Sequence, residues 1–257
     1  MIAAPAPAEL RTPVIVTGGA SGIGLASAQA LAAVGRPVAL WDINGAAAAA
    51  RAEEIAAHYG VAATGIAIDL RDPEAIAPAL DLTRKAVGAP GGLVHSAGIV
   101  DTDSLDGLTV ESWDTGIAIH LRSLALITQA IRSDLAAQDG SAIVAIASIN
   151  ATLGNAINAI YTAAKGGMLS LVRSLADRLA RDGVRINSVS PGPIATPMTN
   201  PTVEALPGFF EKRVLLERVG DPMEVARVVR FLLSSEASFV TAAEIVVDGG
   251  YLSSQRG

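Results

Sequence analysis

The chain has 257 residues, of which 51% are hydrophobic, 17% charged and 4% aromatic, and its formal net charge is −6. Such a chain can bury one large core of small aliphatic side chains, and its acidic balance disfavours a nucleic acid or an anionic membrane as partner. It has no cysteine, which excludes disulfides and thiolate metal sites, and its three histidines share no ligand-like spacing, so we expect no bound metal.

The N-terminal residues 1–10, MIAAPAPAEL, have the Pro/Ala composition of a frayed tail. They lack the basic region and the apolar stretch of a secretion signal. No uncharged apolar run in the chain approaches the length that spans a bilayer. We therefore expect a cytoplasmic protein without a membrane partner.

Short β-branched runs alternate with longer helical patterns along the chain. We expect strands at 13–17, 37–42, 64–69, 92–96, 142–148, 184–190 and 244–248. We expect helices at about 22–34, 45–59, 73–87, 109–137, 157–181 and 222–234. Most strand runs are apolar throughout, as in strands covered on both faces. The alternation predicts an α/β fold: a doubly wound parallel sheet of about seven strands with helices on both faces.

The least regular stretch is residues 191–211, which contains five prolines and two adjacent phenylalanines. A long irregular segment in a compact α/β chain is more often a substrate lid than a linker. No change of composition elsewhere marks a domain boundary, so we expect one domain over residues 1–257.

A glycine-rich turn, TGGASGIG at residues 17–24, follows the first expected strand and leads into the first expected helix. Its glycines allow a close approach of the backbone to a ligand, and the helix N-terminus offers free N–H groups to an anion. The spacing is G-x-x-x-G-x-G instead of G-x-G-x-x-G, and Leu25 stands where a Walker loop has lysine. This context favours a dinucleotide site, with a purely structural turn as the alternative.

Two aspartates end the second and third expected strands. Asp42 lies 18 residues after Gly24, where a carboxylate can bind the adenosine ribose hydroxyls and repel a 2′-phosphate. No basic residue follows it directly, so NAD is preferred over NADP as cofactor; the alternative is a solvated or helix-capping aspartate. Asp69 can reach the adenine or cap the next helix.

Further motifs follow in order: SAG at 96–98, Ser148 after the fifth expected strand, YTAAK at 161–165, PGPIAT at 191–196 and VDGG at 247–250. Together with the glycine turn, they make the chain resemble the short-chain dehydrogenase/reductase family over nearly its whole length. The resemblance implies a single-domain Rossmann fold and a homotetramer with interfaces at 109–137, 157–181 and the C-terminal VDGGYL segment. It also implies catalytic roles for Ser148, Tyr161 and Lys165. With the glycine turn, the expected cofactor contacts are Gly18, Ser21, Gly22, Ile23, Gly24, Asp42, Asp69, Leu70, Ala97, Gly98, Tyr161, Lys165, Pro191, Gly192, Ile194 and Thr196.

The chemistry of these residue types suits hydride transfer between a secondary alcohol and a nicotinamide. Lys165 lies one helical turn after Tyr161, and its charge, with that of oxidised nicotinamide, is expected to lower the tyrosine pKa from about 10. Ser148 is expected to donate to the substrate oxygen. The alternative is an exposed helix pair. Gly166 and Gly167 speak against it, because each costs a helix about 0.8–1.0 kcal/mol and indicates close packing against this turn.

The chain departs from the family pattern at two histidines. His95 stands where the family often has the first asparagine of Asn-Asn-Ala-Gly, and His120 aligns with its usual catalytic asparagine. His120 can hydrogen-bond in that role or relay protons near neutral pH. The alternative is a partly buried helix histidine whose hydrogen-bonding groups are satisfied by a neighbouring residue.

The expected substrate pocket is mostly apolar with some amides. Its candidate residues are Ser148, Asn150, Leu153, Asn155, Asn158, Met198, Leu206, Phe209 and Phe210. Except at Lys212 and Arg213, no cationic clamp for a carboxylate or phosphate is evident. We therefore expect an NAD-dependent dehydrogenase for an apolar or cyclic secondary alcohol or its ketone. The alternatives are a 3-oxoacyl-thioester reductase, an activity that usually takes NADPH, and a non-catalytic nucleotide-sensing protein.

Overall fold

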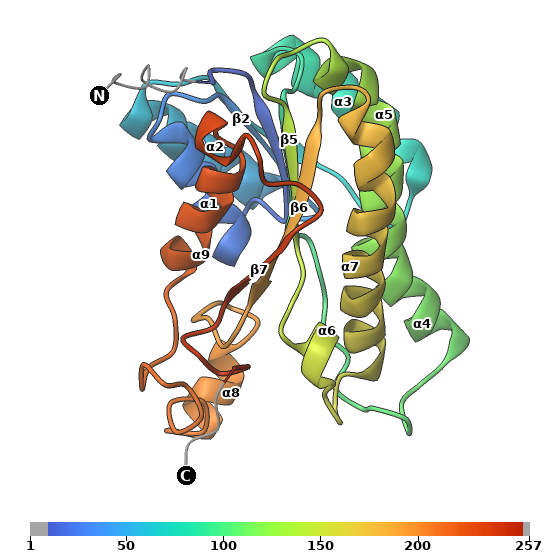
Figure 1. The fold of residues 1–257 in the computed structure, drawn as a ribbon, viewed down its shortest axis with the longest axis vertical. Coiled ribbons are helices and arrows are strands. Elements are labelled where there is room, and N and C mark those ends of the chain that lie inside the picture. Colours follow the sequence, from blue (N-terminus) through green and yellow to red (C-terminus); the bar gives the residue numbers. More distant parts are fainter. Residues whose placement is uncertain (1–9, 254–257) are drawn as a thin grey trace.

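A parallel sheet of seven strands runs through the centre of the computed structural model, which describes residues 10–253 (Figure 1). The strands are β1 (Val14–Thr17), β2 (Val38–Asp42), β3 (Ala63–Ala67), β4 (Gly92–His95), β5 (Ala142–Ile146), β6 (Arg185–Pro191) and β7 (Glu244–Val247). Their order is β3-β2-β1-β4-β5-β6-β7, with every neighbouring pair parallel. The predicted sheet is thereby confirmed, whereas residues 1–9 of the expected tail lie outside the described residues.

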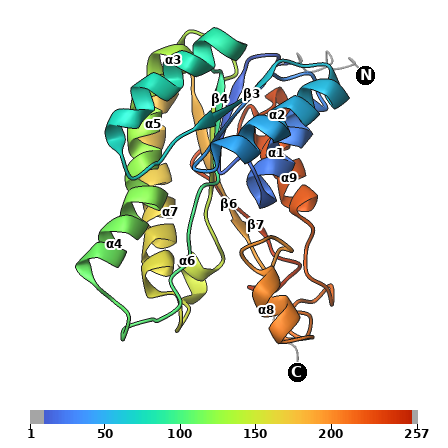
Figure 2. The same ribbon diagram turned by 180° about the vertical axis from the view of Figure 1, so that it is seen from behind.

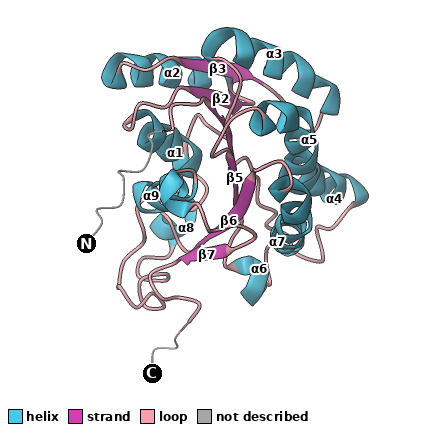
Figure 3. Ribbon diagram, turned by 45° about the horizontal axis from the view of Figure 1, so that its top comes forward, coloured by secondary structure: helices cyan, strands magenta, loops and turns pink. Residues whose placement is uncertain are grey.

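Helices cover both faces of this sheet (Figures 2 and 3). On one face lie α1 (Gly22–Ala32), α2 (Gly45–Tyr59) and α9 (Pro222–Leu232). On the other face lie α3 (Ile76–Val87), α5 (Ser123–Ala136) and α7 (Ala159–Ala180). The helix α4 (Val110–Ile117) precedes α5 and packs against α7. The arrangement is the predicted doubly wound α/β fold.

The strands point their side chains alternately into two cores. In β1, Ile15 packs into the core under α3, α5 and α7, whereas Val14 and Val16 pack into the core under α1, α2 and α9. All three side chains are fully buried. Burial of such a side chain contributes about 1.5–3 kcal/mol, so both faces of the sheet require apolar residues. This requirement explains why the strand runs do not alternate with polar residues.

Several elements begin or end away from their expected positions. The strands β3 and β5 end two residues before Asp69 and Ser148, so both side chains lie in the loops beyond the sheet. The helix expected over 109–137 consists of α4 and α5 joined by a π-helical turn, η2 (Ala118–Arg122). A π-turn makes room for an extra residue in a helix and recurs at functional sites. Hydrophobic periodicity does not reveal such a turn.

Short elements lie near the carboxyl ends of the central strands. The helix α6 (Asn150–Leu153) follows β5, and α8 (Asn200–Ala205) lies within the segment 191–211. Figure 1 shows both at the same end of the molecule. Two 3₁₀ turns, η1 (Pro73–Ala75) and η3 (Ser235–Ala237), complete the described elements. Within residues 10–253, none of the helices combines the length and the apolar character needed to cross a bilayer.

Candidate active site

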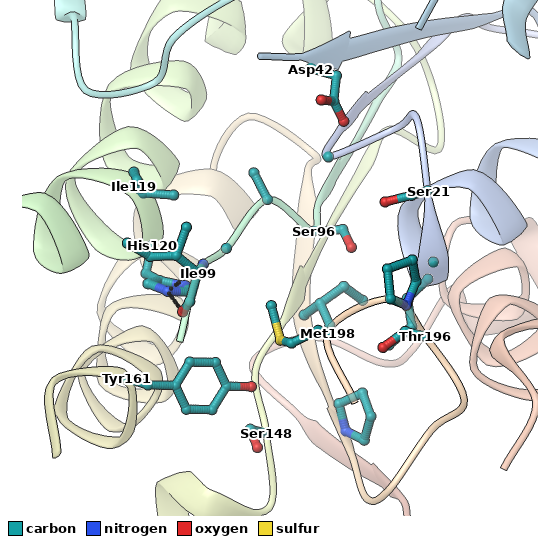
Figure 4. Close-up of a pocket in the computed structure, with 18 of the residues that line it drawn as sticks. Ser21, Asp42, Ser96, Ile99, Ile119, His120, Ser148, Tyr161, Thr196 and Met198 are labelled. Atoms are coloured by element: carbon teal, nitrogen blue, oxygen red, sulfur yellow. Dashed lines mark hydrogen bonds between the residues drawn. The ribbon is translucent and has the colours of Figure 1, made fainter. Parts of the chain in front are cut away.

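A cavity of about 360 Å³ lies beyond the carboxyl ends of β1, β2, β4, β5 and β6 (Figure 4). The connections after β1 and β4 leave on opposite sides of the sheet, which opens a crevice between them. The predicted site residues that line the cavity are Gly18, Ser21, Gly22, Ile23, Asp42, Asp69, Leu70, Ala97, Gly98, His120, Ser148, Tyr161, Lys165, Pro191, Gly192, Ile194, Thr196 and Met198. The fold thus brings together residues that lie far apart in the sequence.

Other predicted residues do not line this cavity. They are Gly24, Asn150, Leu153, Asn155, Asn158, Leu206, Phe209 and Phe210. Asn155 accepts a hydrogen bond from the Ile157 amide at 2.9 Å, and the Asn158 amide donates to the Asp101 carbonyl. Phe209 and Phe210 pack edge to face on each other, with ring centroids 5.1 Å apart. Asn155 and the two phenylalanines thus contact their own loops, and Asn158 contacts the loop after β4, instead of the cavity.

The shape of the glycine turn requires glycine, as Gly18 and Gly24 show. Gly18 has a φ of 65°, and a Cβ there would lie 2.9 Å from the Ala97 Cα. A Cβ on Gly24 would lie 2.1 Å from the Gly18 carbonyl oxygen, so Gly24 packs directly against the backbone at the start of the turn. The N-terminus of α1 thereby meets the cavity at Ser21, Gly22 and Ile23. Its unpaired N–H groups fit an anionic group such as a pyrophosphate.

Asp42 is held at the edge of the glycine turn. Its carboxylate accepts hydrogen bonds from the Ala20 amide at 3.1 Å and from the Asn44 amide at 2.9 Å. Asp42 therefore does not cap α2, because the side chain of Asn44 accepts from Ala47 in that role. Figure 4 shows Asp42 and Ser21 across the cavity from Tyr161 and Ser148. The site has an acidic end and a phenolic end.

Asp69 lies at the same acidic end, paired with an arginine. Its carboxylate accepts from the Arg71 side chain at 2.6 to 3.0 Å and from the Arg71 amide at 2.9 Å. The Arg71 hydrogen bond holds the pKa of Asp69 below its usual value. Asp72, not Asp69, caps the turn that follows. The capping alternative for Asp69 is therefore wrong.

Lys165 is buried with only 3% of its surface exposed. Its Nζ donates to the Ile146 carbonyl at 2.5 Å and lies 5.5 Å from the centre of the Tyr161 ring. Burial lowers the pKa of Lys165 to about 7, because a buried ammonium loses its hydration. Lys165 and Tyr161 therefore do not form an exposed pair on the helix surface.

Tyr161 points its hydroxyl towards Ser148 in Figure 4. Burial raises the pKa of Tyr161 in the chain alone, and a hydrogen bond from Ser148 opposes this rise. The lowered pKa that we expected depends on the charges of the lysine and of oxidised nicotinamide together. Desolvation dominates in the chain alone, because the buried phenolate would lose its hydration.

Comparison with known proteins decides the family. The sequence model of a family described as Enoyl-(Acyl carrier protein) reductase matches residues 18–252. Cyclohexanol dehydrogenase of Acinetobacter sp. (strain SE19) is 38% identical over 240 residues, which cover 93% of this chain and 94% of that protein. A 3-oxoacyl-(acyl-carrier-protein) reductase of Aquifex aeolicus (strain VF5) is 36% identical over 236 residues, covering 92% and 95%.

The chain belongs to the short-chain dehydrogenase/reductase family. A solved short-chain oxidoreductase of Pseudomonas aeruginosa PAO1, bound to NADPH and described as having an atypical catalytic center, superposes with a TM-score of 0.89. It is 27% identical and covers 98% of this chain, which covers 100% of that chain in turn. The protein is therefore an oxidoreductase that acts on secondary alcohols or ketones.

Both histidines that depart from the pattern of the short-chain dehydrogenase/reductase family, His95 and His120, are fully buried. The His95 ring lies 3.2 Å from the His120 main-chain oxygen through Nε2 and 3.1 Å from the Thr17 hydroxyl through Nδ1. Because a carbonyl only accepts, Nε2 carries the hydrogen and Nδ1 accepts from Thr17. The Thr17 hydroxyl also accepts from the Ser96 and Ala97 amides at 3.1 and 3.2 Å. His95 thus ties two strand ends to the π-turn.

His120 forms part of the wall beside Tyr161. Its Nε2 lies 2.8 Å from the Ile99 carbonyl oxygen, and its ring packs edge to face on the Tyr161 ring at 5.5 Å. Burial, then the charge of Lys165, lowers the pKa of His120 to about 3. The imidazole is therefore neutral near pH 7, which argues against a charged proton relay. Its Nδ1 has no hydrogen-bond partner among the described residues.

The two helix glycines after Lys165 have different surroundings. A Cβ on Gly167 would lie 3.0 Å from the Leu121 side chain, so this position is tightly packed against the π-turn. A Cβ on Gly166 would meet only the Ala151 carbonyl oxygen, at 3.8 Å. The expected close packing holds for Gly167 and not for Gly166 within the described residues.

Sequence reasoning missed several residues of the cavity wall. Ile99, Ile119, Pro197 and Thr199 line it, and Ser96 lies beside Ala97 in the loop after β4. For Ser96, Ile99, Pro197 and Thr199 the available signal was the nearby SAG and PGPIAT motifs, and for Ile119 it was the adjacent His120.

Proposed function

We propose that the protein interconverts an apolar or cyclic secondary alcohol and its ketone with NAD(H). The observation that carries this proposal is the meeting of Ser148, Tyr161 and Lys165 in one cavity that also contains the glycine turn and Asp42. An exposed helix pair or a structural glycine turn does not require that convergence. A non-catalytic nucleotide-sensing protein would not require a buried lysine beside a tyrosine either.

Each of the three residues has a distinct part in the proposed chemistry. NAD, when bound at the glycine turn, supplies the hydride acceptor. The Tyr161 Oη takes the hydroxyl proton from the alcohol, or returns it to the ketone in the reverse direction. The Ser148 Oγ holds the substrate oxygen by a hydrogen bond, and the Lys165 ammonium stabilises the phenolate. General base catalysis of this kind contributes about 10²–10⁴-fold to the rate.

The choice of NAD over NADP rests on Asp42. The two backbone hydrogen bonds of its carboxylate fix the negative charge beside the glycine turn. A 2′-phosphate placed there would meet like charge, whereas free ribose hydroxyls can donate to the carboxylate. Asp69 adds a second carboxylate at this end, although Arg71 partly compensates its charge.

The apolar substrate class rests on the cavity wall. Ile99 and Met198 line it and leave 42% of their surfaces exposed, and Ile194 and Pro197 add to the apolar lining. Within residues 10–253, Lys165 is the sole cationic side chain that lines this cavity. Its ammonium already donates to the Ile146 carbonyl, so a small charged acid would lack a cationic partner, whereas a ring such as that of cyclohexanol has matching contacts. We propose that residues 191–211 act as the lid over this substrate.

A second candidate is reduction of a 3-oxoacyl thioester. The 36% identity to a 3-oxoacyl-(acyl-carrier-protein) reductase over nearly the whole chain favours it. The same three catalytic residues would serve, because the acyl group is also reduced at a ketone. The cofactor preference discriminates the two functions. A 3-oxoacyl-thioester reductase usually takes NADPH, whereas the Asp42 carboxylate would repel the 2′-phosphate of NADPH.

An initial-rate panel tests the proposal. Cyclohexanol, cyclohexanone, lactate and a 3-oxoacyl thioester are each supplied with the NAD and the NADP forms of the cofactor. We expect turnover of cyclohexanol or cyclohexanone with NAD(H), at least about tenfold faster than with NADP(H), because like-charge repulsion of this kind costs more than about 1.4 kcal/mol. Activity confined to lactate, or to the thioester with NADPH, would show the assigned substrate class to be wrong.

We also propose a cytoplasmic homotetramer. The support is the family membership and the apolar character of the segments 109–137 and 157–181. Sedimentation equilibrium at several protein concentrations measures this state directly, and a monomer at all concentrations contradicts it.

A further inference from the structure

The catalytic helix α7 lacks a cap from its own residues. Its N-cap residue, Asn158, makes no side-chain capping hydrogen bond, and the first turn contains no acidic residue. Tyr161 is the third residue of this helix. The first N–H groups of any helix have no intrahelical acceptor, so the amides around Tyr161 need partners from elsewhere.

Asp101 supplies those partners from the loop after β4. Its Oδ2 accepts from the Ile160 amide at 3.0 Å, and its Oδ1 accepts from the Tyr161 amide at 2.9 Å. One carboxylate thus satisfies two consecutive helix donors across 60 positions of sequence. Its negative charge also lies at the positive end of the helix, which is favourable.

The loop that carries Asp101 is itself fastened to the start of α7. The Asn158 side chain donates to the Asp101 carbonyl, the Ser104 amide donates to the Ile157 carbonyl at 3.1 Å, and the Ser104 hydroxyl donates to the Ala156 carbonyl. Ser104 has a φ of 50°, a left-handed conformation that costs a non-glycine residue free energy. The two hydrogen bonds of Ser104 hold this strained conformation in place.

The same loop also contacts the Tyr161 ring indirectly, through His120. Ile99, two residues before Asp101, holds the His120 ring by a hydrogen bond from Nε2 at 2.8 Å. His120 packs edge to face on the Tyr161 ring. Residues 99–104 therefore hold the Tyr161 backbone through Asp101 and its ring through His120.

We propose that Asp101 is a positioning residue for the reaction: its carboxylate fixes the first turn of α7 and so places the Tyr161 hydroxyl against the substrate oxygen. This inference rests on the proposed role of Tyr161 in proton transfer. Asp101 itself need not touch substrate or cofactor, and it does not line the cavity that holds Ser148 and Lys165. The expected effect is on the rate of the chemical step and not on cofactor binding.

Another capping aspartate offers a matched control. Asp221 caps α9 through a hydrogen bond from the Met223 amide at 2.7 Å, and it lies outside the cavity. Asp221→Ala therefore removes the same chemical group from a helix that carries no catalytic residue. Loss of a cap lowers the unfolding temperature in both variants.

The experiment compares wild type, Asp101→Ala, Asp101→Asn and Asp221→Ala. Two readouts are taken: steady-state turnover of cyclohexanol with NAD, and amide hydrogen exchange of the peptide that contains residues 158–164. We expect Asp101→Ala to lower kcat about 10–100-fold, because small misplacements of a reacting group have such effects, with the KM for NAD changed less than about twofold. Asp101→Asn keeps one acceptor oxygen and is expected to recover part of kcat.

The outcomes separate this inference from the proposed function. Loss of protection at residues 160 and 161 in Asp101→Ala, with the kcat loss and without either effect in Asp221→Ala, supports the positioning role. Equal kcat and equal exchange in the two alanine variants overturns it. If wild type turns over none of the test substrates, the proposed function fails, and the exchange readout alone then decides whether Asp101 holds the turn.

Discussion

Lys165 is the residue at which stability and the proposed chemistry conflict most directly. Burial removes its hydration, and the Ile146 carbonyl is the acceptor within hydrogen-bond distance of its Nζ. The folded-state pKa of about 7 lies below the ordinary value of 10.5. The protonated lysine therefore destabilises the fold below pH 7, and this cost declines as pH rises from 7 towards 10.5.

Lys165→Met should therefore make the cofactor-free protein more stable at pH 6 and inactive. Methionine fills a similar volume without a buried charge, and such replacements stabilise by about 1–3 kcal/mol. The difference from wild type should shrink at pH 9, where the wild-type lysine is largely neutral. Urea unfolding at both pH values measures it. A variant less stable than wild type at pH 6 would contradict the assignment of a costly buried charge.

At the scale of elements, the π-turn depends on a histidine from a neighbouring strand. His95 at the end of β4 donates to the main-chain oxygen of His120, which lies inside the turn. Burial, then the charge of Lys165, lowers the pKa of His95 to about 3 from 6.5. Its neutral form stabilises the fold fully above pH 6.5, and this contribution is lost as pH falls towards 3.

His95→Asn should consequently weaken the acid dependence of unfolding. Asparagine keeps a donor and an acceptor but does not titrate in this range. Between pH 7 and pH 4.5 the wild type should lose on the order of 2 kcal/mol more than the variant. Guanidinium unfolding at the two pH values gives both differences. Parallel losses in wild type and variant would show that His95 does not titrate as its burial requires.

The sequence allowed most elements to be predicted, because each strand run is buried on both faces and each helix has its own periodicity. The π-turn at His120 was not predictable, since one additional residue barely changes an apolar pattern. The cap of α7 was not predictable either: Asp101 lies 60 positions from Tyr161, and only the folded loop brings them together. The strands β3 and β5 also end two residues earlier than predicted, before Asp69 and Ser148.

At the scale of the whole molecule, the order of the strands places the site. The neighbours of β1 are β2 and β4, so the chain leaves the sheet in opposite directions at this point. The glycine turn, Asp42 and the loop after β4 meet there, and β5 and β6 add Ser148 and the 191–211 segment. The motifs predicted this convergence through family resemblance. Two details were not predictable from residue types: Asn158 bonds to Asp101 in the loop after β4, and Phe209 packs on Phe210.

Turnover by Tyr161→Phe tests the central claim most directly. The change removes only the phenolic hydroxyl, so the cavity and the cofactor contacts stay in place. We predict that kcat/KM for cyclohexanol with NAD falls by about 10²–10⁴-fold, while the Kd for NADH, measured by calorimetry, changes less than about twofold. Wild-type turnover by Tyr161→Phe, with NADH still bound, would contradict the assignment of Tyr161 as the proton-transfer group.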